Sequence, residues 1–243
     1  MKNEFFDINR LPKQAGLLIF GISISKIDNV QKAKKCFEYI DKFYENKIVK
    51  PIVGLNFIYS DNLSLYSDEK ASTLKKKHQA SIHNHKYGFI KILEKNSHYI
   101  PNAFNYTSWG QIILESKQFL SYFEKLKKIY RKDEEFKKIV KKDINLNDKK
   151  VSQNQINFIL EEILMFYLVS KGKVRLNNEY VQDKQKWILW CYPGKPLLSE
   201  IYLFQKNFFK LSNPENVYEN SYYDLIDNKL YDYTKIDLED FEV

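Results

Sequence analysis

The sequence predicts an α/β fold in which a parallel sheet is flanked by helices. Residues 16–22 and 48–59 are two short apolar runs, and such runs are typical of strands that are buried on both faces. Between the runs, apolar residues recur at helical spacing from Val30 to Tyr44. A strand, a helix and a second strand in this order form a βαβ unit, which makes the two strands parallel.

The length fits one large α/β domain or two small ones, and the lack of a clear boundary favours one domain over residues 1–243. The chain of 243 residues is 44% hydrophobic and 16% aromatic, which is enough for a globular protein with a substantial core. Glycine and proline are scarce, and neither an internal repeat nor a linker divides the chain.

The middle of the chain is predicted to be mostly helical. Residues 68–96 are expected to form a helix, and residues 98–107, which Pro101 interrupts, a loop or a short strand. From Trp109 to about Arg131, apolar residues recur along one stripe, which predicts a long amphipathic helix. Asp133 then has the position of an N-cap, with two glutamates in the first turn of a further helix.

A buried helix and a late strand are predicted to follow. Ser152 can cap a helix that is apolar on most sides, and we expect that helix to lie at the centre of the fold. The run WILWCYP at 187–193 predicts a strand that ends at Pro193, because proline cannot donate to a sheet ladder. Pro196 is expected to start a helix that runs to about Lys210. No sequence pattern predicts a structure for the tail from residue 213, which ends in acidic residues.

The charge indicates a polyanionic partner. A formal net charge of +8 is typical of proteins that bind nucleic acid or anionic membranes, although solubility and an AT-rich genome produce the same excess. The distribution favours RNA, because Lys125, Lys128 and Lys132 share one face of the predicted helix with little compensating glutamate. The residues expected to contact RNA phosphates are Lys117, Lys125, Lys128, Arg131, Lys132, Lys137 and Lys138. No helix-turn-helix is recognisable, so DNA is not an expected partner.

The sequence argues against a membrane, a metal and a cofactor. Residues 1–14 lack the features of a signal peptide, and no stretch approaches the ~18 consecutive apolar residues of a membrane span. The two cysteines, Cys36 and Cys191, form no zinc-binding pair and suit a reducing compartment, so we expect a cytoplasmic protein. His83 and His85 diverge on a helix, and no phosphate-binding loop is present.

Three features are candidates for catalysis. Ser23 follows the first strand, where parallel sheets hold nucleophiles and ligands, but a serine at this place is also a common helix cap. Glu161 and Glu162 point about 100° apart, so one can lie in apolar surroundings with a raised pKa, unless both lie on an exposed polar stripe. Tyr192 ends the late strand, either as a proton relay or as an ordinary boundary tyrosine.

The order of these motifs resembles the tRNA-dependent cyclodipeptide synthases over residues 16–205. A strand followed by G-I-S precedes a Trp-led basic helix, a Phe-x-x-x-Glu helix and a strand that ends in C-Y-P. The three signature positions of that family are Lys26, Tyr192 and Pro193 here, which resembles the subgroup with a variable residue, tyrosine and proline. The resemblance implies a Rossmann-like domain similar to the catalytic domain of class I tyrosyl- and tryptophanyl-tRNA synthetases.

The resemblance also implies roles for individual residues. Ser23 corresponds to the nucleophile and Gly21 to the small residue that lines its pocket. Glu162 corresponds to the carboxylate that handles the substrate amine. Tyr192 corresponds to the tyrosine that positions the aminoacyl group and assists proton transfer.

One position departs from the pattern of the family. Phe158 stands where these enzymes usually have a second tyrosine, so one hydroxyl is missing. Phe158, Lys26 and Pro193 are nevertheless expected beside the substrate. A helix register shifted by one residue would make Glu161 the acid instead.

The implied reaction uses two aminoacyl-tRNAs and needs no cofactor, because their esters are already activated. Ser23 would accept the first amino acid, Glu162 would deprotonate its amine, and the resulting dipeptide would close into a 2,5-diketopiperazine. The alternatives are a non-catalytic RNA-binding module of the same fold and a ligase that uses another acceptor amine. The amino acids that are joined and the oligomeric state follow from no pattern in the sequence.

Overall fold

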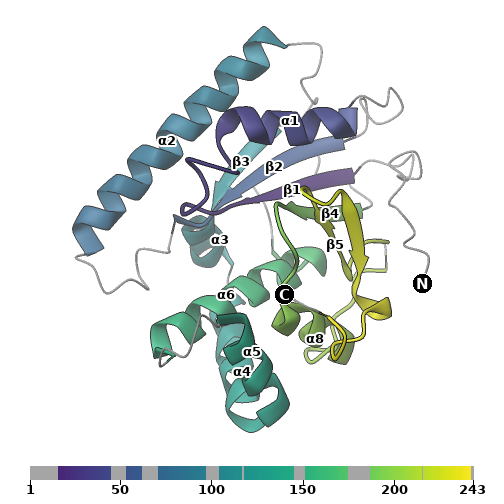
Figure 1. Ribbon diagram of the computed structural model, residues 1–243. Coiled ribbons are helices and arrows are strands. Elements are labelled where there is room, and N and C mark those ends of the chain that lie inside the picture. Colours follow the sequence, from purple (N-terminus) through teal and green to yellow (C-terminus); the bar gives the residue numbers. More distant parts are fainter. Residues whose placement is uncertain are drawn as a thin grey trace.

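The computed structural model describes residues 16–44, 53–61, 71–96, 104–116, 118–144, 151–174, 187–214 and 216–241. Within these ranges, six strands form one sheet in the order β3-β2-β1-β4-β5-β6. The strands are β1 (Gly16–Ile22), β2 (Val53–Tyr59), β3 (Phe104–Ser108), β4 (Trp187–Tyr192), β5 (Ser221–Asp224) and β6 (Lys229–Asp232). All neighbouring pairs are parallel except β5 and β6. This is the strand order of doubly wound Rossmann folds, so the predicted fold class is confirmed (Figure 1).

Helices cover both faces of the sheet (Figure 1). One face packs against α1 (Ala33–Tyr44) and α2 (Ala71–Lys95). The other packs against α3 (Trp109–Glu115), α4 (Phe119–Lys132), α5 (Glu134–Ile144), α6 (Gln153–Ser170) and α8 (Leu198–Lys206). The chain adds β2 and β3 on one side of β1 and then β4 on the other. Because parallel crossovers are right-handed, this reversal moves the later helices to the opposite face.

The strand β1 is buried on both faces because its residues alternate between two cores. Leu17 and Ile19 face the layer that contains α6, whereas Leu18 and Phe20 face α1 and α2. None of the four side chains is more than 1% exposed. The continuous apolar run in the sequence is therefore the signature of a central parallel strand.

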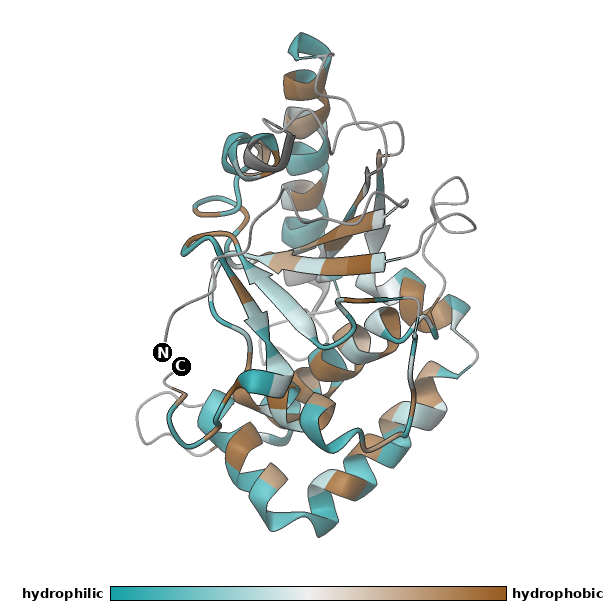
Figure 2. Ribbon diagram, turned by 90° about the vertical axis from the view of Figure 1, so that its right-hand side faces the viewer, coloured by the Kyte–Doolittle hydropathy of each residue, from teal (hydrophilic) through white to brown (hydrophobic). Residues whose placement is uncertain are grey.

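The helix α6 is the buried helix that its apolar sequence predicts. Ser152 and Gln155 form a capping box at its start, so the predicted cap is confirmed. Phe166 of α6 meets Trp190 of β4 edge to face, with ring centroids 4.2 Å apart. Asp133 likewise caps α5, accepting a hydrogen bond of 2.9 Å from the N–H of Phe136. Figure 2 shows hydrophilic and hydrophobic residues alternating along α4 and α5, the lowest helices in that view.

The predicted bounds of two helices are wrong. The helix after β1 begins at Ala33, because residues 24–32 form turns in which Val30 is 40% exposed. The helix predicted from Pro196 to Lys210 spans only Leu198–Lys206. It ends at Asn207, whose φ of 44° is left-handed.

The predicted long helix from Trp109 to Arg131 is in fact two helices. After α3, the backbone of Ser116 becomes extended, and its N–H donates to the carbonyl of Ile112. The chain resumes as α4 at Phe119, which is 1% exposed. The break separates α4 from α3, which begins at Trp109 directly after β3.

The C-terminal tail completes the sheet, which the sequence did not predict. β5 extends the parallel part beside β4, β6 forms the edge, and a 3-10 turn at Tyr233–Lys235 follows. Asp224 at the end of β5 accepts a hydrogen bond of 3.0 Å from the N–H of Gly194, which fixes the loop after β4.

Parts of several predicted segments lie outside the residues that the structure describes. Of the predicted helix 68–96, residues 71–95 belong to α2, and residues 68–70 lie outside. Of the predicted strand 48–59, residues 53–59 belong to β2, and residues 48–52 lie outside the described ranges. Of the predicted loop or short strand 98–107, residues 104–107 belong to β3, and residues 98–103 lie outside. Among the described helices, none combines the length and the apolar character that crossing a membrane requires.

Candidate active site

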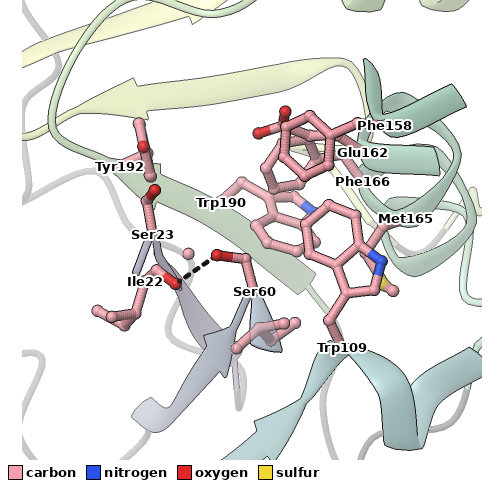
Figure 3. A pocket seen from close by; sticks show the side chains of 12 residues that line it. Ile22, Ser23, Ser60, Trp109, Phe158, Glu162, Met165, Phe166, Trp190 and Tyr192 are labelled. Carbon is pink, nitrogen blue, oxygen red and sulfur yellow. Dashed lines mark hydrogen bonds between the residues drawn. The ribbon is translucent and has the colours of Figure 1, made fainter. Parts of the chain in front are cut away.

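The carboxyl ends of β1 and β4 meet where the strand order changes direction, which is where open parallel sheets bind ligands. Ser23 directly follows β1, and Tyr192 is the last residue of β4. Both line a pocket of about 30 Å³ (Figure 3). The pocket is lined by Gly21, Ile22, Ser23, Ile58, Ser60, Trp109, Phe158, Glu162, Met165, Phe166, Trp190 and Tyr192.

Ser23 does not cap a helix, so that interpretation is wrong. The following helix, α1, begins only at Ala33. The Oγ of Ser23 lies 2.9 Å from the Oγ of Ser25, and its side chain forms a hydrogen bond with Tyr192. Figure 3 shows the hydroxyls of Ser23 and Tyr192 pointing toward one another at one side of the pocket.

Tyr192 faces the pocket from the end of β4. Burial raises the pKa of its hydroxyl well above the ordinary value, and the charge of Glu162 raises it further, while the hydrogen bond with Ser23 acts in the opposite direction. The hydroxyl therefore stays protonated at neutral pH and can donate a hydrogen bond to an oxygen in the pocket.

Lys26, Tyr192 and Pro193 contact one another. Lys26 Nζ lies 4.5 Å from the centroid of the Tyr192 ring and donates a hydrogen bond of 3.5 Å to the carbonyl of Pro193. Burial lowers the pKa of Lys26, whereas the charges of Glu162 and Asp224 raise it. A cation is thus fixed beside the tyrosine and close enough to Glu162 for electrostatic interaction.

The two neighbouring glutamates of α6 have different surroundings. Glu162 lines the pocket, and burial raises its pKa to about 7, with Lys26 acting against the rise and Asp143 adding to it. Glu161 is 5% exposed and accepts a hydrogen bond of 2.7 Å from Trp109 Nε1. The interpretation of both residues as an exposed polar stripe is therefore wrong, and Glu162 is the carboxylate at the pocket.

Aromatic and aliphatic side chains form the wall around Glu162. Phe158, one helical turn earlier, stacks on Trp109 with ring centroids 6.1 Å apart and planes at 20°. Met165, Phe166 and Trp190 complete this wall. Their low polarity accounts for the raised pKa of Glu162, because burial disfavours the charged carboxylate. With phenylalanine at 158, this position of the wall carries no hydroxyl.

Gly21 leaves space for the tyrosine. A Cβ at Gly21 would lie 3.2 Å from Tyr192 Cδ2, which is closer than ordinary van der Waals contact. The absence of a side chain at 21 therefore allows the ring of Tyr192 to lie against β1.

Two pocket residues that the sequence analysis missed also follow strand ends. Ser60 directly follows β2, and Trp109 directly follows β3. The same rule that singled out Ser23 after β1 predicts both positions, because the carboxyl ends of parallel strands share one edge of the sheet. Trp190 could have been found in a different way. Residues two apart on a strand share a face, so Trp190 lies on the same face of β4 as the candidate Tyr192.

Most of the predicted RNA-binding residues lie on an exposed surface of α4 and α5. Lys125, Lys128, Arg131 and Lys132 of α4 are exposed, and so is Lys138 of α5. On the opposite side of α4, Phe119, Leu126 and Tyr130 are buried, as the predicted stripe requires.

Some of this positive charge is compensated within the helices. Lys137 is only partly exposed and pairs with Glu134 at 2.6 Å, and Lys127 pairs with Glu124. Lys117 lies outside the described residues. Three of the exposed lysines line a groove of about 790 Å³ next to Phe208 and Phe209. The residues of this groove are Lys125, Lys128, Ile129, Lys132, Asp133, Glu134, Phe208 and Phe209.

The histidines of α2 were not expected to form a metal site. His83 is exposed, whereas His85 is buried at 5% exposure, so the two side chains diverge as a helix requires. In the part of the chain that the structure describes, no group of three or more histidine, cysteine or carboxylate side chains is suited to hold a metal ion.

Neither a protein-family model nor a curated protein matches this sequence. Solved structures do match. The cyclodipeptide synthase of Staphylococcus haemolyticus has a TM-score of 0.54 at 15% identity, and the match covers 83% of this chain and 87% of that one. The synthase of Candidatus Glomeribacter gigasporarum, bound to Phe-tRNAPhe, has a TM-score of 0.53 at 15% identity, with 84% and 88% covered.

A third match connects this fold to another class of enzymes. A Mycobacterium tuberculosis protein has a TM-score of 0.51 at 13% identity, with 76% of this chain and 77% of that one covered. Its structure is described as demonstrating that cyclodipeptide synthetases are related to type I tRNA synthetases. The chain therefore has the fold of the solved cyclodipeptide synthases, a Rossmann-like fold related to that of type I tRNA synthetases.

Proposed function

We propose that this protein is a tRNA-dependent cyclodipeptide synthase that joins the amino acids of two aminoacyl-tRNAs into a 2,5-diketopiperazine. The main support is that Ser23, Glu162 and Tyr192 line one pocket at the carboxyl edge of the sheet. The fold also supports the proposal, because solved cyclodipeptide synthases share it, and one of them is bound to Phe-tRNAPhe. The residues Lys26, Tyr192 and Pro193 support membership of the subgroup with a Tyr-Pro signature.

In the first step, Ser23 accepts an amino acid from a tRNA. The Oγ attacks the ester carbonyl, a new ester bond to Ser23 forms, and the bond to the ribose oxygen of the tRNA breaks. The proton of the Ser23 hydroxyl ends on that ribose oxygen. Tyr192 is hydrogen-bonded to Ser23 and stays protonated, so it positions the reacting oxygens and assists the proton transfer.

In the second step, the amine of the acylated Ser23 attacks the second aminoacyl-tRNA. An ammonium group cannot attack, so it must first lose a proton. Glu162 has a pKa near 7 and is thus partly ionised at neutral pH, which suits a general base. Lys26 stabilises the ionised carboxylate. The peptide bond forms as the second tRNA leaves with a proton on its ribose oxygen.

In the third step, the free amine of the dipeptide attacks the ester of Ser23. The ring closes, and the serine hydroxyl is regenerated. Because both reacting groups belong to one bound molecule, proximity favours this closure. The apolar wall of Phe158, Met165 and Phe166 limits the access of water, which would otherwise hydrolyse the ester.

We assign binding of the tRNA phosphates to the basic surface of α4 and α5. The residues are Lys125, Lys128, Arg131, Lys132, Lys137 and Lys138 of these helices, together with Lys117, which lies outside the described residues. Phosphate contacts of this kind hold the acceptor arm without reading its sequence. The proposal treats residues 1–243 as one domain and places the protein in the cytoplasm, where aminoacyl-tRNAs are made.

The test is expression in bacteria followed by mass spectrometry of the medium. We expect a diketopiperazine from the wild type and none from Ser23→Ala, while Ser25→Ala, a change of the neighbouring serine, still yields product. The proposal is wrong if well-expressed wild-type protein makes no diketopiperazine or if Ser23→Ala still makes it.

Incubation with labelled aminoacyl-tRNA separates the alternatives. Retention of RNA with no label on the protein would indicate a binding module. Label on Ser23 without a cyclic product would indicate a ligase with another acceptor amine.

A further inference from the structure

The side chain of Gln31 bonds to the backbone of the Ser23 turn at two points. Its Oε1 accepts a hydrogen bond of 2.8 Å from the N–H of Ser23, and its Nε2 donates one of 2.5 Å to the carbonyl of Gly21. Gln31 is 1% exposed, although it lies in the turn before α1. The amide thus provides the acceptor and the donor that a neighbouring strand would provide.

Ser60 holds the alternate peptide groups of the same turn. Its N–H and its hydroxyl donate to the carbonyl of Ile22 at 3.0 and 3.1 Å, and its hydroxyl accepts from the N–H of Ile24 at 3.3 Å. Because successive residues of an extended chain direct their backbone groups to opposite sides, Gln31 and Ser60 hold the turn from two sides. Ser23 therefore has a defined backbone position just beyond the sheet.

A buried histidine holds Gln31 in turn. His85 Nε2 lies 2.8 Å from the carbonyl oxygen of Gln31, and its Nδ1 lies 2.8 Å from the Tyr59 hydroxyl. A carbonyl only accepts, so Nε2 carries the proton and Nδ1 of the neutral ring accepts from Tyr59. Burial lowers the pKa of His85, which keeps this neutral form. The thiol of Cys36 donates to the same carbonyl at 3.2 Å.

We propose that Gln31 is a positioning residue that fixes the Ser23 peptide so that the serine hydroxyl faces Tyr192 and the pocket. A primary amide suits this place because it donates and accepts at once and bears no charge. Without it, the N–H of Ser23 and the carbonyl of Gly21 lose these partners, and the turn shifts. The catalytic consequence rests on the proposed function, whereas the structural part does not.

Two substitutions separate positioning from simple packing. Gln31→Met keeps the size and removes both hydrogen bonds. Gln31→Glu keeps the shape, and when protonated its carboxyl both donates and accepts, so it reproduces both bonds. When ionised, it only accepts and repels the carbonyl of Gly21.

The measurement is the single-turnover rate at which Ser23 is acylated by bacterial tRNA charged with a mixture of radiolabelled amino acids. We expect Gln31→Met to lower the maximal rate about 10- to 100-fold, with the half-saturating tRNA concentration within about twofold of the wild type. Gln31→Glu should approach the wild-type rate near pH 6 and lose it toward pH 8.5. The wild-type rate should not fall over this range.

Other groups around Gln31 do not produce this pH dependence. Burial lowers the pKa of His85 and raises the pKa of Cys36 and of Tyr59, so burial disfavours the charged form of all three groups. The exposed carboxylate of Asp28 faces His85 from the turn and is common to all variants.

Hydrogen exchange of the Ser23 amide tests the structural part without any substrate. We expect exchange at least about 10-fold faster in Gln31→Met than in the wild type, and no change in Gln79→Met, a control at an exposed position of α2. Unchanged exchange in Gln31→Met, or a Gln31→Glu variant with the pH profile of the wild type, would overturn the proposal. If the wild type is never acylated, the proposed function fails, and the exchange rates still decide whether Gln31 holds the turn.

Discussion

The indole N–H of Trp109 donates a hydrogen bond of 2.7 Å to Glu161, and this bond distinguishes two adjacent glutamates. Trp109 directly follows β3, and Glu161, to which it is bonded, is not among the residues that line the pocket. The next residue, Glu162, then lines the pocket together with Phe158. One residue of helix register thus separates an anchoring carboxylate from a candidate base.

Substitution of Glu162 should affect product formation, whereas substitution of Glu161 should affect stability. Glu162→Gln should lower product formation about 100-fold or more, because the amide cannot accept the substrate proton, and should leave the fold intact. Glu161→Gln should retain product formation and lower the free energy of unfolding by about 1 kcal/mol, because a neutral acceptor replaces a charged one. Product yield and thermal melting of both variants measure this. Loss of product only in Glu161→Gln would show that the roles are reversed.

The rate of product formation should rise with pH through about 7. Glu162 accepts a proton only when ionised, and its pKa lies at about 7. Lys26 favours the ionised form, so Lys26→Met should move the midpoint of the pH–rate profile to higher pH. Lys26→Arg keeps the charge and should leave the midpoint close to that of the wild type. Initial rates between pH 6 and 8.5 measure the shift, and identical midpoints for Lys26→Met and the wild type would contradict it.

The free energy of unfolding should fall as the pH rises from about 4.5 through about 8. Burial raises the pKa of Glu162 to about 7 and of Glu200 to about 8, whereas both groups ionise near their ordinary values once the chain unfolds. The folded state therefore binds more protons than the unfolded state in this window, and it loses stability as these protons are released.

Glu200 provides the clearest test of this linkage. It is 2% exposed and accepts a hydrogen bond of 2.5 Å from the Tyr233 hydroxyl, which an amide oxygen can also accept. Glu200→Gln should flatten the decline in stability between pH 6 and 8, as measured by urea unfolding at several pH values. An equally steep decline in the variant would rule out Glu200 as its source.

Charge on the outer face of α4 should control the affinity for tRNA. Lys125→Glu, Lys128→Glu and Lys132→Glu should each weaken binding and reduce the slope of log K against log salt by about 1. Lys127→Glu is the control, because Lys127 is already paired with Glu124 on the same helix. Binding titrations at several salt concentrations measure the slopes. Equal effects at Lys127 and Lys128 would indicate a general charge effect rather than a binding face.

The elements that were predicted correctly from the sequence are those whose local pattern is compatible with a single structure. β1 and α6 are buried on nearly every side, so their continuous apolar runs identified them. The caps Ser152 and Asp133 were predictable because a cap bonds to backbone only three residues away. The break at Ser116 was missed, since the apolar stripe continues across it although the backbone does not.

The candidate site was predictable in part for the same reason. Ser23 and Tyr192 were identified from their places at strand ends, and Ser60 was missed although it follows the same rule. Glu161 and Glu162 could not be separated by local pattern, because their surroundings come from α3 and β4, which are distant in the sequence. Gln31 had no signal at all, since its partners are backbone groups that only the folded turn brings to it.

The sequence by itself therefore determined the α/β class, the buried strand β1 and the place of Ser23 after it, because alternation, apolar runs and caps act over a few residues. Only the tertiary structure decided which glutamate faces the pocket, that the acidic tail completes the sheet, and that Gln31 holds the Ser23 turn. These outcomes depend on hydrogen bonds and burial between segments far apart in the chain, and no local pattern specifies such contacts.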